Sequence, residues 1–345
     1  MRSVLVLTAA LALTAGRLLQ AQADTSLVAS GATIERVWTG GYFLEGPAAA
    51  PDGSLYFSDL AWNFRFRDTP TAVAAGTLRR YDPRTGTTTV VLSPSGMSNG
   101  IAFGPDGQMY VAHGADFGLR QISRIDPKTG LAYIAAARYR GRPFNAPNDL
   151  VVDSRGRVFF TDPRYLGDEP IEQPVQGVYR LDPDGSVHLI AADLGKPNGI
   201  ALSPDERTLY VVSVGTSETD FPMADKLPTR SLLEAIAAYD LSPDGAATFR
   251  RLVVDFSARP DRPERNGPDG ITTDRYGNIF ATHAAWNAVV AFDPQGRELG
   301  RIPIPEGAAN LEFGRGNEAD VLYLAAQTSL YRVRVKTRGW HLGTP

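Results

Sequence analysis

Six oxygen-bearing side chains recur at one position of a repeated phrase in the sequence. Each lies eight residues before a turn residue, which is glycine in four of the phrases and glutamate in two. The six residues are Glu45, Asn99, Asn148, Asn198, Asp269 and Asn310. Carboxylate and amide oxygens are the ligands that a hard cation such as Ca²⁺ prefers. If the fold brings these side chains together, they form a site for a divalent ion, with two negative charges from Glu45 and Asp269.

Two other interpretations of these residues remain open. Asn-Gly and Asp-Gly are common turn dipeptides, and a ring of polar side chains can also be a solvated lining that holds no metal. Here, however, a hairpin turn already follows eight residues later, and Glu45 has no role in a turn. The chain has no cysteine and only four histidines, which excludes thiolate sites and argues against structural zinc.

The elements that position these residues are predicted to be short β-strands. Each of the six residues leads into an apolar strand, a turn such as Pro51-Asp52-Gly53, and a second strand. A second phrase, in which a strand ends at an Asp-Pro turn such as Tyr81-Asp82-Pro83, supplies another hairpin. Units of two hairpins recur roughly every 45 to 70 residues, which is typical of propeller blades.

The sixth unit predicts how the ring closes. It runs from Asn310 to Val335 and has room for only three strands, while the strand at 33–38 has no hairpin partner. We expect this N-terminal strand to complete the last blade, which also removes an exposed sheet edge. The sequence therefore predicts an all-β, six-bladed β-propeller with four-stranded blades, formed as a single domain by residues 24–345.

The first strand of a propeller blade lines the central channel. The six polar residues should therefore form a ring at one mouth, with the short turns on the opposite face and the long loops around the ring. Long loops on one rim suit a substrate pocket, although each aromatic residue on them can equally well pack under its loop. The candidate substrate-binding residues are Asn99, His113, Asp149, Tyr165, His283 and Trp62.

The first 23 residues have the pattern of a cleavable export signal. Arg2 precedes an apolar run at 4–15, and Ala21-Gln22-Ala23 fits the cleavage pattern, so a mature chain should start at Asp24. We therefore expect a periplasmic or secreted protein. The formal net charge is −3 and no dense basic run is present, which argues against nucleic acid or an anionic membrane as a partner of the mature form.

Several motifs resemble the gluconolactonase/regucalcin (senescence-marker protein) family, over nearly all of the mature chain. The segments that carry the resemblance are Glu45-Gly46-Pro47, NAPNDLVVD at 145–153, FTDP at 160–163, PNGIALSPD at 197–205 and PDGI at 268–271. The resemblance implies a six-bladed propeller with one catalytic divalent metal, usually calcium. Matching positions would make Glu45, Asn148, Asn198 and Asp269 its ligands, with Asp269 also the candidate general base.

Two features relate to individual branches of that family. His113-Gly114 resembles a His-Gly pair of gluconolactonase-like members, while Ala146 stands where the regucalcin branch has arginine. Recognition of a sugar acid should therefore differ from that branch.

These observations favour a metal-dependent hydrolase that opens a small cyclic ester, with a sugar lactone as the expected substrate. Calcium is the expected ion, and zinc, manganese and magnesium are alternatives. Asp269 would act as base or as nucleophile. The rival hypotheses are a hydrolase of organophosphates or aryl esters at the same site, a non-catalytic binding propeller with a structural metal, and a polar channel without metal.

Overall fold

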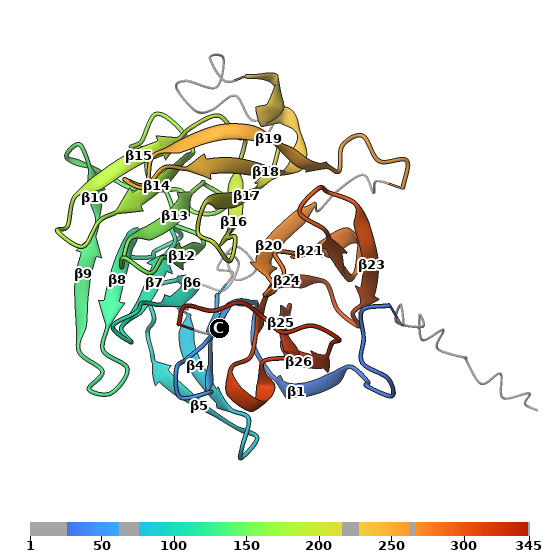
Figure 1. The fold of residues 1–345 in the computed structure, drawn as a ribbon. Coiled ribbons are helices and arrows are strands. Elements are labelled where there is room, and N and C mark those ends of the chain that lie inside the picture. Colours follow the sequence, from blue (N-terminus) through green and yellow to red (C-terminus); the bar gives the residue numbers. More distant parts are fainter. Residues whose placement is uncertain (1–25, 62–75, 216–227, 262–266, 344–345) are drawn as a thin grey trace, which may run out of the picture.

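The computed structural model describes residues 26–61, 76–215, 228–261 and 267–343. Over these residues, six four-stranded antiparallel sheets follow one another around a central axis (Figure 1). This arrangement confirms the predicted six-bladed propeller. None of the helices in the described ranges is long and apolar enough to cross a membrane.

In the first three blades the strands follow one another in sequence from the channel outwards. The first blade comprises β2 (Leu44–Ala49), β3 (Leu55–Asp59), β4 (Thr77–Asp82) and β5 (Thr87–Leu92). The second comprises β6 (Ser98–Phe103), β7 (Met109–His113), β8 (Gln121–Ile125) and β9 (Ala132–Ala136). The third comprises β12 (Leu150–Val152), β13 (Val158–Asp162), β14 (Gly177–Leu181) and β15 (Val187–Ala191).

The fourth and fifth blades repeat this order, whereas the last blade is completed from the other end of the chain. The fourth comprises β16 (Pro197–Leu202), β17 (Thr208–Val214), β18 (Glu234–Leu241) and β19 (Ala247–Asp255). The fifth comprises β20 (Pro268–Thr273), β21 (Ile279–His283), β22 (Ala288–Phe292) and β23 (Glu298–Pro303). The sixth comprises β24 (Ala308–Phe313), β25 (Val321–Ala326), β26 (Ser329–Arg334) and the N-terminal β1 (Glu35–Thr39). β1 pairs antiparallel with β26, as predicted.

The remaining elements are short. A two-stranded ladder of β10 (Arg138–Tyr139) and β11 (Arg142–Pro143) connects the second and third blades. The 3-10 turns are η3 (Thr229–Leu232), η4 (Ala284–Trp286) and η5 (Gly316–Glu318).

The core of the propeller lies between the blades. Six hydrophobic clusters each join two neighbouring blades. In one of them, Val212 and Ile236 of the fourth blade pack with Ile279 and Phe292 of the fifth. Because every blade is held on both sides in this way, the inner strands are fixed relative to one another around the channel.

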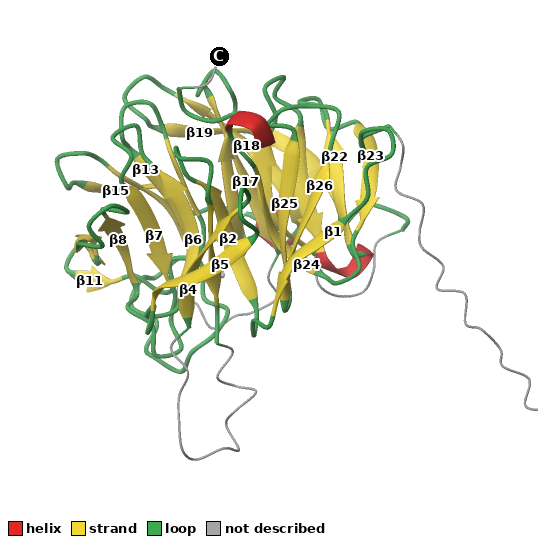
Figure 2. Ribbon diagram, turned by 90° about the horizontal axis from the view of Figure 1, so that it is seen from below, coloured by secondary structure: helices red, strands yellow, loops and turns green. Residues whose placement is uncertain are grey.

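The two ends of the channel differ, and the side view of Figure 2 shows the strands running between them. The turns between first and second strands lie at one end, which we call the turn face. In the first of these turns Gly53 has φ +86° and Asp52 accepts the N–H of Ser54 (2.9 Å). We call the opposite end, where the first strands begin, the ring face.

Candidate functional site

The predicted ring residues lie at or just before the start of the innermost strands. Five of them line a single cavity of about 700 Å³ at the ring face, and these are Glu45, Asn99, Asn148, Asn198 and Asp269. The sixth, Asn310, lines the channel beneath that cavity. The structure therefore gathers all four residues that the resemblance assigns to a metal.

Irregular strand pairing and glycine allow these residues to come together. The register between the first two strands shifts beside the ring position, for example between Glu45 and Ala48 and between Pro268 and Ile271. A glycine follows the ring residue in four blades. A Cβ on Gly100 would lie 2.6 Å from the Cα of Asp149 in the next blade. The glycines are thus required for the close approach of neighbouring inner strands.

Three buried acidic side chains interact electrostatically in the channel. Burial, followed by the charges of Asp269 and Asp149, raises the pKa of Glu45 well above its usual value. Burial and the charge of Asp149 raise the pKa of Asp269 to about 7, against a hydrogen bond from Asn198. Burial raises the pKa of Asp149 to about 6. Burial and mutual repulsion thus make the fully charged set of carboxylates unfavourable, and a proton or a cation relieves this.

The donor set fits a hard divalent cation. None of the described residues that line the 700 Å³ cavity is lysine or arginine. The Oδ1 atom of Asn99 is buried and accepts no hydrogen bond from the described part of the chain. No group of three or more His, Cys, Asp or Glu side chains in that part is arranged for a metal. Ligands beyond Glu45 and Asp269 would therefore be amide oxygens and water, as calcium accepts.

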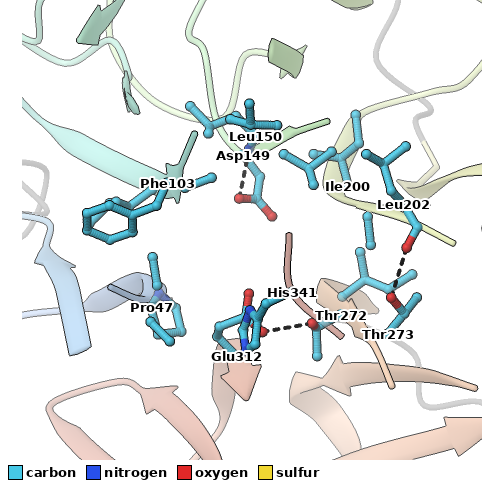
Figure 3. Close-up of a pocket in the computed structure, with 18 of the residues that line it drawn as sticks. Pro47, Phe103, Asp149, Leu150, Ile200, Leu202, Thr272, Thr273, Glu312 and His341 are labelled. Carbon is cyan, nitrogen blue, oxygen red and sulfur yellow. Dashed lines mark hydrogen bonds between the residues drawn. The ribbon is translucent and has the colours of Figure 1, made fainter. Parts of the chain in front are cut away.

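The candidate substrate-binding residues fall into different places. Tyr165 lines the ring-face cavity beside Asn99, and its hydroxyl donates to the carbonyl of Lys196 (3.3 Å). Asp149 points into the channel beneath the cavity (Figure 3). Trp62 lies outside the described residues.

Both histidines of that set are buried at the ends of second strands. Nδ1 of His113 lies 3.0 Å from the carbonyl oxygen of Ser95, so this nitrogen carries the proton. The ring of His283 stacks on Trp286, with 3.9 Å between centroids. Burial lowers the pKa of each histidine to about 4, so both are neutral at pH 7. Neither is among the residues that line the ring-face cavity, because each closes a strand instead of lying on the loop that follows.

Sequence reasoning missed the residues that support the ring from the second strands. Hydroxyl groups of Ser58 and Thr161 donate to the carbonyl oxygens of Asn99 (2.8 Å) and Asn198 (2.9 Å) in the following blades. Thr282 donates in the same way to Ala309 (2.7 Å). The repeated Ser or Thr as the penultimate residue of the second strand is the signal that could have found them.

The channel is covered at the turn face. A smaller cavity of about 80 Å³ lies there, between Asp149, Glu312 and His341 (Figure 3). The C-terminal segment 340–342 lines it, with the Trp340 N–H bonded to the carbonyl of Thr273 (3.1 Å). Glu312 accepts from Thr272 Oγ1 (2.9 Å), and burial raises its pKa to about 7. The larger cavity at the ring face is therefore the candidate substrate site.

Comparison with known proteins shows the family of the chain and agrees with its fold. The model of the family described as SMP-30/Gluconolactonase/LRE-like region matches residues 43–328. The chain belongs to this family. Among SMP-30/gluconolactonase relatives, a gluconolactonase of Zymomonas mobilis is 34% identical over 86% of this chain and 79% of its own. A pentonolactonase of Haloferax volcanii is 29% identical over 81% of this chain and 80% of its own.

Solved structures of the SMP-30/gluconolactonase type have the same fold. A gluconolactonase of Xanthomonas campestris superposes with a TM-score of 0.71 and 29% identity, covering 90% of this chain and 91% of that one. A calcium-binding regucalcin of Agrobacterium tumefaciens superposes with a TM-score of 0.66 at 18% identity, covering 90% and 98%. The second likeness concerns the fold alone.

Proposed function

We propose that the chain is a lactonase of the gluconolactonase type that requires a divalent ion, with calcium as the expected ion. The observation that carries the proposal is the pair of buried acidic residues, Glu45 and Asp269, which share the floor of an open cavity with three amide side chains. The names of the relatives support a lactone as the substrate class.

Glu45, Asn148, Asn198 and Asp269 would hold the ion. When bound, a divalent ion supplies electrostatic stabilisation to the carbonyl oxygen of the substrate and acidifies water. The two carboxylates balance its charge, and Asn198 orients Asp269 through a hydrogen bond. Because the ring residues are buried, their carboxylate and amide groups are already oriented before the substrate binds.

Asp269 is the proposed catalytic residue. As a base it takes a proton from the attacking water while the water oxygen bonds to the carbonyl carbon. The ring C–O bond then breaks, and the released ring oxygen takes up the proton. As a nucleophile, Asp269 would itself bond to the carbonyl carbon while the ring C–O bond breaks, and water would then hydrolyse the anhydride formed. A cation beside Asp269 lowers its pKa and weakens it as a base, so both roles remain in the proposal.

The decisive experiment measures lactone hydrolysis by the chain from Asp24, with glucono-δ-lactone in the substrate panel and spontaneous hydrolysis subtracted. Activity should disappear with a chelator and return with calcium, zinc or manganese. Absence of hydrolysis with any ion, combined with a rise in Tm on adding calcium, would replace the lactonase by a binding propeller with a structural metal.

A second candidate function has support from the walls of the cavity. Phe43, Leu60, Leu166 and Val214 line it together with Tyr165. Apolar walls suit an aryl ester or an organophosphate better than a polyhydroxylated ring. The same panel separates the two functions: the lactonase predicts higher kcat/KM for sugar lactones than for phenyl acetate or paraoxon.

The proposed place of action is the periplasm or the outside of the cell, after removal of residues 1–23. Sequencing of the N-terminus of the protein recovered from its own cells tests this proposal, because a mature chain should begin at Asp24.

A further inference from the structure

A residue at the end of the second strand, or next to its end in the fourth blade, occupies the same place in several blades. It lies opposite the residue that precedes the ring position, as in the pairs Leu44–Asp59, Ser98–His113, Pro197–Ser213 and Pro268–His283. In the third blade this residue is Asp162, next to Thr161, whose carbonyl accepts the N–H of Asn148. The side chain at this position therefore faces the backbone just before the ring residue. We call this segment the strap; it comprises residues 42–44 before Glu45 and residues 145–147 before Asn148.

In two blades this residue is a buried carboxylate that accepts two N–H groups of the strap. Asp59 accepts from Tyr42 (2.7 Å) and Phe43 (3.3 Å), which are three and two residues before Glu45. Asp162 accepts from Asn145 (2.9 Å) and Ala146 (2.7 Å), which stand at the same distances before Asn148. The same contact thus recurs in two blades that both deliver a residue of the proposed metal site.

Each oxygen of Asp162 receives a different N–H group. A carboxylate satisfies this arrangement, whereas the side-chain amide of asparagine offers one oxygen only. Hydrogen bonds to a buried carboxylate are about twice as strong as those between neutral groups. Loss of the acceptor would also leave a buried N–H unpaired, which is unfavourable.

The strap of the third blade is held on its other side as well. Arg120 Nε donates to the carbonyl oxygens of Phe144 (2.8 Å) and Asn145 (3.1 Å). The side chain of Asn145 donates to Val175 (3.0 Å) and accepts from Gln173 (3.1 Å). With this many restraints, the point at which Asn148 projects into the cavity depends on the strap and not on the first strand, which begins only at Leu150.

We propose that Asp59 and Asp162 are positioning residues, which fix Glu45 and Asn148 at the ring by holding the straps before them. Two other blades use uncharged side chains at this position. In the fourth blade, Ser213 Oγ accepts from Gly195 at 3.4 Å. In the second, His113 donates to the strap carbonyls. The expected effect on ion binding rests on the proposed function. The role of the two aspartates in fixing the strap does not.

The same blade offers a matched control at the turn face. Asp153 is also buried and also accepts two backbone N–H groups, from Arg155 (3.0 Å) and Arg157 (2.9 Å). Both N–H groups bond to Oδ1, and the other oxygen accepts from Arg157 Nε (2.6 Å). Asp153→Asn therefore removes a buried ion pair from the same blade without moving the ring.

The test compares calcium binding by titration calorimetry for the wild type, Asp162→Asn and Asp153→Asn. It is run at pH 8, above the value of about 7 to which burial raises the pKa of Asp162. Residues that orient ligands typically contribute 10–100-fold to metal affinity. We expect a Kd at least about tenfold weaker for Asp162→Asn and an unchanged Kd for Asp153→Asn. Equal Kd values in all three proteins, or an equal loss in both variants, would overturn the proposal.

A second readout does not depend on the ion. Hydrogen exchange at the amides of Asn145 and Ala146 should be faster in Asp162→Asn than in Asp153→Asn. If the wild type binds no divalent ion, the proposed function fails, and this exchange still decides whether the strap is held. Unchanged exchange would overturn the positioning role. If Asp162→Asn does not fold, Asp59→Ala tests the same proposal, because it removes the oxygen that accepts from both Tyr42 and Phe43.

Discussion

The side-chain amide of Asn310 donates a hydrogen bond to Glu45 (3.3 Å), from the last blade of the propeller to the first. The same nitrogen lies 3.5 Å from an oxygen of Asp149 in the third blade. The ring of blades is thus closed twice, by β1 on β26 at its outside and by this amide inside the channel. The inner closure joins two acidic residues whose charges repel each other.

Asn310→Ala should lower the free energy of unfolding of the chelated protein by about 0.5–1.5 kcal/mol, the usual net contribution of a hydrogen bond, because the raised pKa of Glu45 favours its neutral form without a cation. Asn278→Ala is the control, because Asn278 also donates to a carboxylate, that of Asp274 (2.8 Å), but at the turn face. Only Asn310→Ala should also weaken calcium binding. Equal calcium affinities for the two variants would show that the inner closure has no part in the site.

Much of this architecture could be predicted from the sequence because turns and strands repeat with a local signature. The position of Glu45 or Asp269 in the ring follows from counting eight residues back from a turn. The depth of each ring residue could not be predicted, since it depends on where the strand register shifts. Asn310 therefore lies deeper in the channel than Asn99.

The residues that hold the ring residues in place could not be predicted from the sequence for a different reason. Asp162 acts on backbone N–H groups sixteen and seventeen residues upstream, and every residue type except proline offers such a group. His113 was expected on a long loop, whereas it closes β7 and is buried. Its aromatic character gave no information about burial.

The contribution of Asp269 and Asp149 to the stability of the chelated protein should fall as the pH rises from about 4 to about 7. The folded state raises the pKa of Asp269 to about 7 and that of Asp149 to about 6. In this range the folded state binds more protons than the unfolded state, so each rise in pH favours unfolding. Bound calcium replaces those protons, and the increase in Tm caused by calcium should grow up to about pH 7 and then level off.

Scanning calorimetry at pH 5, 6, 7 and 8, with chelator and with calcium, measures this difference. The buried neutral His113 and His283 act in the opposite direction, because their stabilisation is lost as the pH falls below about 6.5. The two histidines contribute equally with and without calcium. Their contribution therefore cancels in the difference between the Tm with calcium and the Tm with chelator. A calcium effect on Tm that stays constant from pH 5 to 8 would contradict the role of the acidic residues.

Asp269→Asn should reduce kcat for lactone hydrolysis by about 100-fold or more, the usual contribution of a general base. The fold should be largely preserved, because the amide keeps the volume of the side chain and relieves repulsion with Glu45. Kinetics and circular dichroism check this prediction. Asp293→Asn, at the turn face of the same blade, is the control and should keep full activity. Full activity in Asp269→Asn would remove Asp269 from the mechanism.

Gly100→Ala should weaken calcium binding by more than its effect on stability accounts for. The new Cβ would lie 2.5 Å from Asp149 Oδ1 and 2.8 Å from the backbone oxygen of Asn148, so the segment that carries Asn148 must move. Gly107→Ala in the turn of the same blade meets no atom within 4 Å, but its φ of +75° costs about 1–2 kcal/mol. Overpacking at Gly100 costs a comparable 1–3 kcal/mol or so. The two variants should therefore unfold at similar denaturant concentrations, while calcium affinity falls by about tenfold or more only in Gly100→Ala. If both variants bind calcium as the wild type does, close contact between the inner strands does not set the geometry of the site.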